Sequence, residues 1–377
     1  ETAQRCERKK EYRYVRGYRR RVKGIKLERG TWIHELLAAY YQGIQQGAEN
    51  PLANARTVHE KLLKEKWDTL FDEEKEQLGA DFPDTCWKIF ERYVDHWQSV
   101  DAANIRKILF VEKELKVRVP WLPVPFIFKC DLVYVDRIGN VWIMDHKVVG
   151  TIPDEESRML DNQGPRYIIG MADLLLQKGI EVRGVGMIYD YIRDRLPAEP
   201  KMLKDGTLSK DRRIDTDYTT YKAAIEKHGL DPKDYADILE HIAQNQKLYF
   251  DRWPVAKSKE RLEQERRDMQ AEALKHLPAK DYYPRTLDRS RCSWDCEYKD
   301  ICLLELEGGD ISHLLRIVEE RGEDSDEIIL STNCIAGLYG NPQNQRNYPP
   351  DFYGGYQEVN VFQNLVDAFL MTDGMSI

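Results

Sequence analysis

The stretch 126–148, FIFKCDLVYVDRIGNVWIMDHKV, decides the fold. Apolar residues dominate 126–135 and 141–148, and the short segment between them, DRIGN, carries the Gly and Asn that tight turns favour. The stretch therefore predicts two strands joined by a hairpin loop.

Regular patterns continue on both sides of this hairpin. Residues 108–119 alternate apolar and polar side chains, which predicts a half-buried strand, and 182–191 predicts a fourth strand. Residues 160–178 predict a helix packed on the sheet, although Pro165 weakens its first turn. Further helical patterns cover 29–48, 52–77, 84–99 and 220–276. We therefore expect an α/β fold with a mixed central sheet, flanking helices and added helical regions.

The chain has 377 residues, enough for two or three domains. We expect four segments along it. They are a helical region with a basic segment and one cysteine (1–106), a core (107–192), an insertion with helices and a cysteine cluster (193–304), and an acidic tail or small subdomain (305–377).

Composition and charge narrow the function classes. Hydrophobic residues make up 42%, which is enough for a core and argues against wholesale disorder. No apolar run is long enough to cross a bilayer and no signal peptide is visible, so we expect no membrane contact and a cytoplasmic location. Residues 1–30 hold twelve Lys and Arg against four Asp and Glu, which predicts either a polyanion site or a solvated helix face.

Charged residues interrupt the second strand of the hairpin. Asp145 and Lys147 are two residues apart, so both project from one face of a strand, beside Asp131 on the neighbouring strand. Two carboxylates bind a hard divalent cation such as Mg²⁺, and a lysine beside it orients a water or neutralises charge on a phosphate. The alternative is a structural Asp–Lys ion pair at a strand end.

Asp131 followed by Asp145-His146-Lys147 resembles the motif of the PD-(D/E)XK nuclease superfamily, and within it the RecB-type exonuclease branch. The resemblance implies a restriction-endonuclease-like fold. It also implies Mg²⁺ or Mn²⁺ at the active site, held by His34, Asp131, Asp145 and the main-chain carbonyl of His146, with Lys147 as a catalytic residue.

Three further features fit that branch. Gly30-x-x-x-His34 resembles its histidine motif, and Gln163-x-x-x-Tyr167 resembles its Q-x-x-x-Y motif. Glu112 matches an acidic residue often found in the strand before the hairpin. The resemblance implies catalytic roles for Gln163, Tyr167 and Glu112. Three of these residues have structural alternatives: His34 as a packed or capping histidine, Tyr167 as an anchor of its helix on the sheet, and Glu112 as an outward-facing strand residue.

A cysteine cluster completes the resemblance. Cys292, Cys296 and Cys302 stand in a C-x₃-C-x₅-C pattern, and Cys6 could supply a fourth thiolate. This pattern is similar to that of iron–sulfur members such as the AddB nuclease domain and the CRISPR-associated adaptation exonucleases. Four thiolates suit a [4Fe–4S] cluster, with a structural Zn²⁺ as the alternative. Either group would tie the start of the chain to its C-terminal helices.

The function that follows is a metal-dependent DNA exonuclease acting on single-stranded ends in recombination, repair or replication, with 5′→3′ digestion favoured. Softer likenesses suggest a phage-encoded member that acts in the host cell cytoplasm. Homo-oligomers and recombination or helicase partners are compatible with this family. The alternatives are a catalytically silent module that binds DNA or a helicase, and a structure-specific endonuclease.

Overall fold

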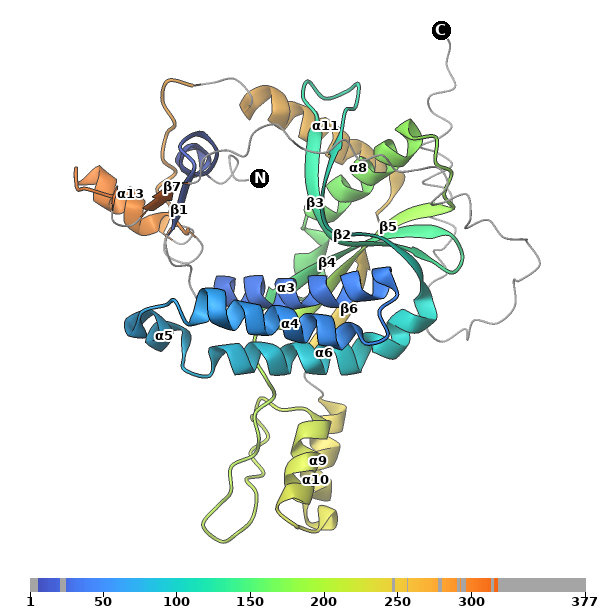
Figure 1. The fold of residues 1–377 in the computed structure, drawn as a ribbon, viewed down its shortest axis with the longest axis vertical. Helices are drawn as coiled ribbons and strands as arrows, with labels where there is room; N and C mark the ends of the chain where they lie inside the picture. The colour runs from blue at the N-terminus through green and yellow to red at the C-terminus, as the bar shows by residue number, and fades with distance from the viewer. Residues whose placement is uncertain are drawn as a thin grey trace.

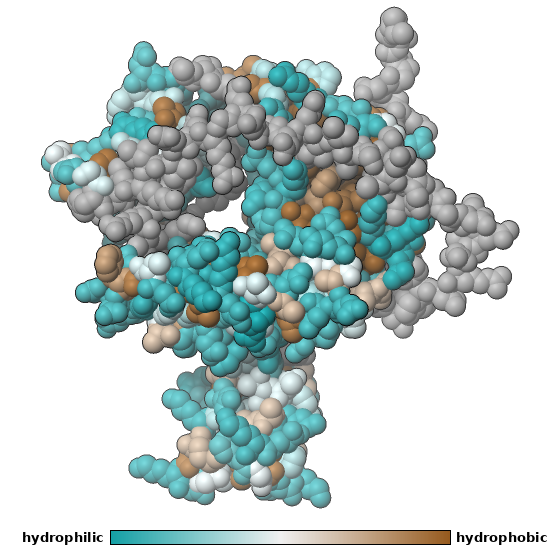
Figure 2. Space-filling model, in the orientation of Figure 1, coloured by the Kyte–Doolittle hydropathy of each residue, from teal (hydrophilic) through white to brown (hydrophobic). Residues whose placement is uncertain are grey.

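The computed structural model describes residues 6–20, 25–245, 248–255, 257–276, 280–289, 292, 296–312 and 315–317. The predicted acidic tail therefore lies outside the described residues from 318 onward. No helix in the described part of the chain is both long and apolar enough to cross a membrane. The face shown in Figure 2 is mainly hydrophilic.

A mixed sheet of five strands forms the centre, as expected, with the order β2-β3-β4-β5-β6 (Figure 1). Strands β4 and β5 run parallel, and the other neighbours are antiparallel. The strands are β2 (Ile105–Val117), β3 (Phe126–Asp136), β4 (Asn140–Val149), β5 (Gly184–Arg193) and β6 (Phe250–Val255).

The turn of the β3–β4 hairpin is fixed by Asp136. Its Oδ1 accepts hydrogen bonds from the main-chain N–H groups of Ile138 and Asn140, at 3.0 and 2.8 Å. Gly139 takes the positive φ, 95°, that the turn requires. The ladder of paired residues that begins here ends at Leu132 and Met144, so the two strands part just before the next residue of each.

Helices cover both faces of the sheet (Figure 1). One face packs against α3 (Ile25–Gln46) and α6 (Phe82–Asn104), and the other against α8 (Gln163–Gln177) and α11 (Lys259–His276). The predicted helix at 52–77 is divided into α4 (Pro51–Leu62), a π-helical turn (Leu63–Trp67) and α5 (Asp72–Leu78). The short helix α7 (Glu155–Met159) precedes α8.

The prediction of helix throughout 220–276 was wrong at β6. This strand pairs antiparallel with β5 from Met187–Val255 to Ile192–Phe250. It lies at the edge of the sheet, where Pro254 can be accommodated. Its sequence, FDRWPV, has no alternation of apolar and polar residues, so pairing with β5 rather than local pattern makes it a strand.

The segment between β5 and β6 projects from the body (Figure 1). It contains an extended region, α9 (Tyr218–Lys227), a 3₁₀ turn (Pro232–Tyr235) and α10 (Ala236–Gln244). The projection has its own small core, formed by Leu208, Tyr221, Ala224, Ile225, Tyr235, Ile238, Leu239 and Ile242. The predicted surface insertion at 193–219 thus forms the first part of this projection, and Leu208 from it packs with α9 and α10.

The two ends of the described chain meet in a small unit, here called the cysteine module. It contains α2 (Glu7–Lys10), a π-helical turn (Glu11–Val15), β1 (Tyr18–Arg20), α13 (Lys299–Leu306) and β7 (Leu315–Ile317). Strands β1 and β7 pair antiparallel and lie beside α13 (Figure 1). Tyr12, Tyr298 and Ile301 form the buried centre of the module.

Candidate active site

The parted ends of β3 and β4 carry the predicted carboxylates. On β4, Asp145 lies on the face toward α8, and Lys147 lies on the same face with its Nζ 2.7 Å from Asp145 Oδ2. On β3, Asp131 lies one residue before Leu132, where pairing with β4 ends, and its Oδ2 accepts a hydrogen bond of 2.8 Å from the main-chain N–H of His146. The hairpin register therefore brings both carboxylates to one place.

Helix α3 brings His34 to the same place. Its apolar residues Ile33, Leu36 and Leu37 are fully buried against the sheet side of the helix, which leaves His34 beside β2 and β3. The Nδ1 of His34 lies 3.7 Å from Asp131 Oδ2. The predicted convergence of His34 with the hairpin carboxylate is thus present in the structure.

Glu112 also belongs to this site. His34 Nδ1 lies 3.5 Å from Glu112 Oε1, and Lys129 pairs with the other carboxylate oxygen. Glu112 has φ of +49°, a left-handed conformation that is costly for any residue with a Cβ. Strain of this kind persists where the surrounding structure enforces it, and it concentrates at functional sites.

His34, Glu112 and Asp131 form a group able to hold a metal ion. Among the described residues, this is the set of three whose ligand atoms all lie within 4.8 Å of one another. One imidazole nitrogen and two carboxylate oxygens suit Mg²⁺ or Mn²⁺ better than a soft metal. The set does not include Asp145, which is 5% exposed and paired with Lys147.

Helix α8 supplies the residue that joins Asp145 to Lys147. Gln163 Nε2 donates to Asp145 Oδ1 at 2.9 Å, and Lys147 Nζ donates to Gln163 Oε1 at 2.6 Å. The helix begins at Gln163 rather than at 160, and Pro165 falls in its first turn, where no amide donor is needed. Tyr167, one turn further, packs on Phe128 with ring centroids 5.3 Å apart.

The electrostatics of the site favour a bound cation. Burial raises the pKa of Asp145; the Lys147 ammonium opposes this effect and the Asp131 carboxylate adds to it. Burial alone would lower the pKa of His34, but Glu112 and Asp131 outweigh it and the pKa is raised. Neighbouring acids therefore stabilise positive charge here. The raised pKa values mean that Asp145 and His34 retain protons more readily than usual, and a bound divalent ion would neutralise the same negative charge.

The side chain of His146 faces away from the carboxylates. Its ring is buried on the α3 and α6 side of the sheet, where Nδ1 lies 2.9 Å from Asp190 Oδ2. Its imidazole is therefore not turned toward the metal group, and ligation by its main-chain carbonyl stays a prediction. Asp190 was not predicted as a site residue, although a single acid inside the apolar strand GVGMIYDYIR was a signal.

In the cysteine module, the sulfur atoms of Cys6 and Cys292 both contact the main chain of Thr286. The main-chain N–H of Thr286 donates to Cys6 Sγ, and Cys292 Sγ donates to the Thr286 carbonyl, both at 3.5 Å. Burial raises the pKa of Cys296, and the nearby Cys292 and Cys6 add to this effect. The first cysteine of the chain thus lies near the C-terminal cluster.

Cys302, the last cysteine of the C-x₃-C-x₅-C pattern, has a cationic neighbour. Arg285 Nε donates to Cys302 Sγ at 3.3 Å, and its guanidinium also pairs with Glu305. N–H donors to sulfur stabilise a thiolate, which is the form that binds metals. The four cysteines are free of disulfides in the structure.

Basic residues near the start of the chain are engaged within the protein. Arg16 pairs with Glu305 at 2.9 Å, and Arg13 pairs with Glu297 at 3.2 Å. Arg8 pairs with Glu11 at 2.6 Å. The first two contacts join the π-helical turn and the residue after it to α13 and the residues just before α13, whereas Arg8–Glu11 is a local pair at the end of α2. At least this part of the basic segment therefore helps to close the module.

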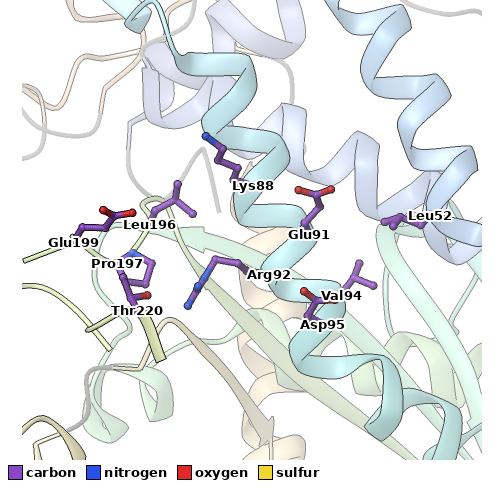
Figure 3. A pocket seen from close by; sticks show the side chains of 10 residues that line it. All are labelled: Leu52, Lys88, Glu91, Arg92, Val94, Asp95, Leu196, Pro197, Glu199 and Thr220. Atoms are coloured by element: carbon purple, nitrogen blue, oxygen red, sulfur yellow. The ribbon is translucent and has the colours of Figure 1, made fainter. Parts of the chain in front are cut away.

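A pocket of about 400 Å³ lies away from the carboxylates, between α6 and the base of the projection (Figure 3). Its lining mixes both charges, including Lys88, Glu91 and Arg92 of α6 and Glu199 across from them. None of the predicted site residues lines it.

Comparison with known proteins agrees with the geometry. No curated protein matches the chain. The model of the PD-(D/E)XK nuclease superfamily matches residues 1–303, a range that includes the whole sheet, the carboxylate site and the cysteine module up to Leu303. The mixed sheet with helices on both faces is the restriction-endonuclease-like fold that was expected. The chain belongs to the PD-(D/E)XK nuclease superfamily.

Proposed function

We propose that this protein is a metal-dependent DNA exonuclease that acts on single-stranded ends. Membership of the superfamily makes it a nuclease that uses divalent metal ions, and the finer assignment is ours. The observation that carries it is the meeting of His34, Asp131, Asp145 and Lys147 where β3 and β4 part.

Different residues of the site bind the cation and stabilise the phosphate. His34, Asp131 and Glu112 offer the ligand atoms for a cation, and Asp145 lies beside them with its second oxygen paired to Lys147. A bound Mg²⁺ or Mn²⁺ would supply a more acidic water and neutralise charge on the scissile phosphate. Lys147 carries a positive charge toward the same phosphate, where it stabilises the charge that builds up during hydrolysis.

Lys147 is held ready for this role. Burial alone would lower its pKa, but the Asp145 carboxylate outweighs burial and the pKa is raised, so the amine stays protonated. Gln163 fixes the ammonium group from the other side at 2.6 Å. In this arrangement Gln163 positions Lys147 and Asp145, and Tyr167 holds α8 against β3 through Phe128.

Two motifs support the exonuclease assignment. Gly30-x-x-x-His34 and Gln163-x-x-x-Tyr167 resemble those of the RecB-type exonuclease branch. In the structure His34 lies beside Asp131, and Gln163 donates a hydrogen bond to Asp145. The presence of His34, Asp131, Asp145 and Lys147 together argues against a catalytically silent module, since binding DNA alone requires neither the carboxylates nor the lysine beside Asp145. We place the protein in recombination, repair or replication of phage DNA on likeness alone.

For the cysteine module we propose a [4Fe–4S] cluster. Structural zinc sites usually take their ligands from two close-spaced pairs. Here three cysteines stand in one short C-x₃-C-x₅-C stretch, and Cys6 comes from the start of the chain. Four thiolates divided in this way suit an iron–sulfur cluster better. The cluster would fasten the first helix to the last.

The nuclease assignment is tested with end-labelled linear single strands, circular single strands and linear duplex, each with Mg²⁺, Mn²⁺ or EDTA. We expect metal-dependent loss of linear single strands and no cutting of circles. Asp145→Ala and Lys147→Ala should each lower the rate by about 100- to 1,000-fold. Lys88→Ala, on the exposed surface of α6, is the control. Cutting of circles would identify an endonuclease, and full activity of either site variant would refute the assignment.

The cluster is tested by iron, sulfide and zinc analysis of protein purified without oxygen. A [4Fe–4S] cluster gives about four irons and four sulfides per chain, and Cys296→Ser should lose them. Cys86→Ala, at a buried cysteine outside the module, should retain them. Zinc in place of iron would refute the cluster and identify a structural Zn²⁺ site instead.

A further inference from the structure

A row of three polar residues crosses the sheet beneath the site, on its opposite face. In the strand register His146 of β4 pairs with Asp190 of β5, and Asp190 pairs with Arg252 of β6. The side chains follow the same order, with His146 Nδ1 2.9 Å from Asp190 Oδ2 and Arg252 Nε 3.4 Å from Asp190 Oδ1. Asp190 is completely buried.

Helices α3 and α6 complete this network. Tyr93 donates to Asp190, and the ring of Tyr41 stacks on the imidazole of His146 at 5.8 Å. Arg252 also forms an ion pair with Asp101, and the Tyr41 hydroxyl donates a hydrogen bond to Asp101 at 2.8 Å. Helices α3 and α6 and strands β5 and β6 thus each contribute a side chain that contacts the His146 ring directly or through Asp190.

Stability alone does not explain such a network. Asp190 is a fully buried acid that is surrounded by Arg252, His146 and the Tyr93 hydroxyl. Ion pairs taken out of water repay their desolvation poorly, and well-packed apolar residues in their place are often as stable or more so. The surrounding core of Leu132, Met144 and Ile192 shows that apolar packing serves elsewhere on this face.

His146 links the network to the cation site. Its main-chain N–H holds Asp131 Oδ2 at 2.8 Å, and its ring meets the ring of His34 edge-on at 6.0 Å. Its chain neighbours are Asp145 and Lys147. Fixing the imidazole on one face therefore fixes the main chain that places the carboxylates and the lysine on the other.

We propose that Asp190, supported by Arg252, is a positioning residue that sets the geometry of the cation site through His146. This inference rests on the proposed function, in which the site binds Mg²⁺ or Mn²⁺. Asp190 touches neither substrate nor cation and acts from the far side of the sheet. Groups that orient the residues around a metal are worth about 10- to 100-fold in metal affinity.

The experiment measures equilibrium binding of Mn²⁺ to the full chain by the loss of the free-ion electron paramagnetic resonance signal. We expect Asp190→Asn to weaken binding by about 10- to 100-fold. Asp217→Asn is the matched control, because Asp217 is also a buried carboxylate that pairs with an arginine, Arg92, but it caps the start of α9 in the projection. It should retain wild-type affinity even if its thermal stability falls.

A second variant guards against misfolding. His146→Phe keeps an aromatic ring between Tyr41 and Tyr93 but cannot bond to Asp190, and it should weaken Mn²⁺ binding in the same way. Wild-type affinity in either variant, when folded by circular dichroism and melting cooperatively, overturns the positioning role. Absence of Mn²⁺ binding by the wild-type protein overturns the proposed function instead, so the two failures are distinct.

Discussion

The strained backbone at Glu112 predicts an unusual order of stabilities. Two substitutions remove the same carboxylate: Glu112→Ala keeps a Cβ, and Glu112→Gly does not. Both lose the contacts to His34 and Lys129, so those losses cancel when the two variants are compared. The remaining difference is the cost of a Cβ at φ of +49°.

The magnitude follows from two opposing effects. In an ordinary strand, Gly is about 0.5–1 kcal/mol less stable than Ala because the unfolded chain is more flexible. A left-handed conformation costs a residue with a Cβ about 1–2 kcal/mol. The second effect is larger, so Glu112→Gly should be more stable than Glu112→Ala by about 1 kcal/mol, which corresponds to about 2–4 °C in Tm for a domain of 150–250 residues.

The assay is thermal unfolding of both variants without metal ions, because a bound cation would add its own stabilisation. Nuclease activity should fall in both variants, since each lacks the same carboxylate. A Glu112→Ala protein as stable as Glu112→Gly, or more stable, would show that the backbone is relaxed there and would remove strain as an argument for function.

Two further predictions concern packing and pH. Gly170→Ala would place a Cβ 2.7 Å from the Phe126 ring, so it should destabilise by about 1–3 kcal/mol in urea unfolding, whereas Gly30→Ala, with its nearest contact at 3.9 Å, should not; equal midpoints would mean that α8 lies farther from β3. Burial raises the pKa of Glu305, but Tyr12 and Arg16 outweigh it and hold the pKa below 4.5. A carboxylate with a depressed folded pKa stabilises above its unfolded pKa and loses that contribution as pH falls through the folded value. Unfolding followed from neutral pH to below 4.5 should therefore lose less stability in Glu305→Gln than in wild type, and identical pH profiles would contradict the ion pairs of the cysteine module.

The sequence predicted the hairpin and its carboxylates because both depend on local rules. A turn sequence sets the register, and the strand period of two places Asp145 and Lys147 on one face. For Glu112 the sequence offers little beyond the family resemblance, because alternation places it at an ordinary strand position. Its left-handed backbone, which depends on contacts with β3 and α3, has no local signal.

Strand β6 and the network behind the site could not be found in this way. The strand FDRWPV has a proline and no alternation, and only the exposed edge of β5 makes it extended. The role of Arg252 depends on its ion pair with Asp190. Asp190 lies 62 positions earlier, and the two residues meet only in the assembled sheet. Partners that are distant in sequence leave no periodic pattern in either segment.

The position of the α9–α10 projection bears on how this protein could diversify. The segment leaves the sheet after Arg193 and returns at Phe250, and Arg193 N–H bonds to the Tyr249 carbonyl at 2.9 Å, so its two ends are adjacent. A tight reverse turn could close the same gap. Lineages are therefore free to exchange, lengthen or delete this appendage while inheriting the hydrolytic centre intact, and divergence among relatives should accumulate there first.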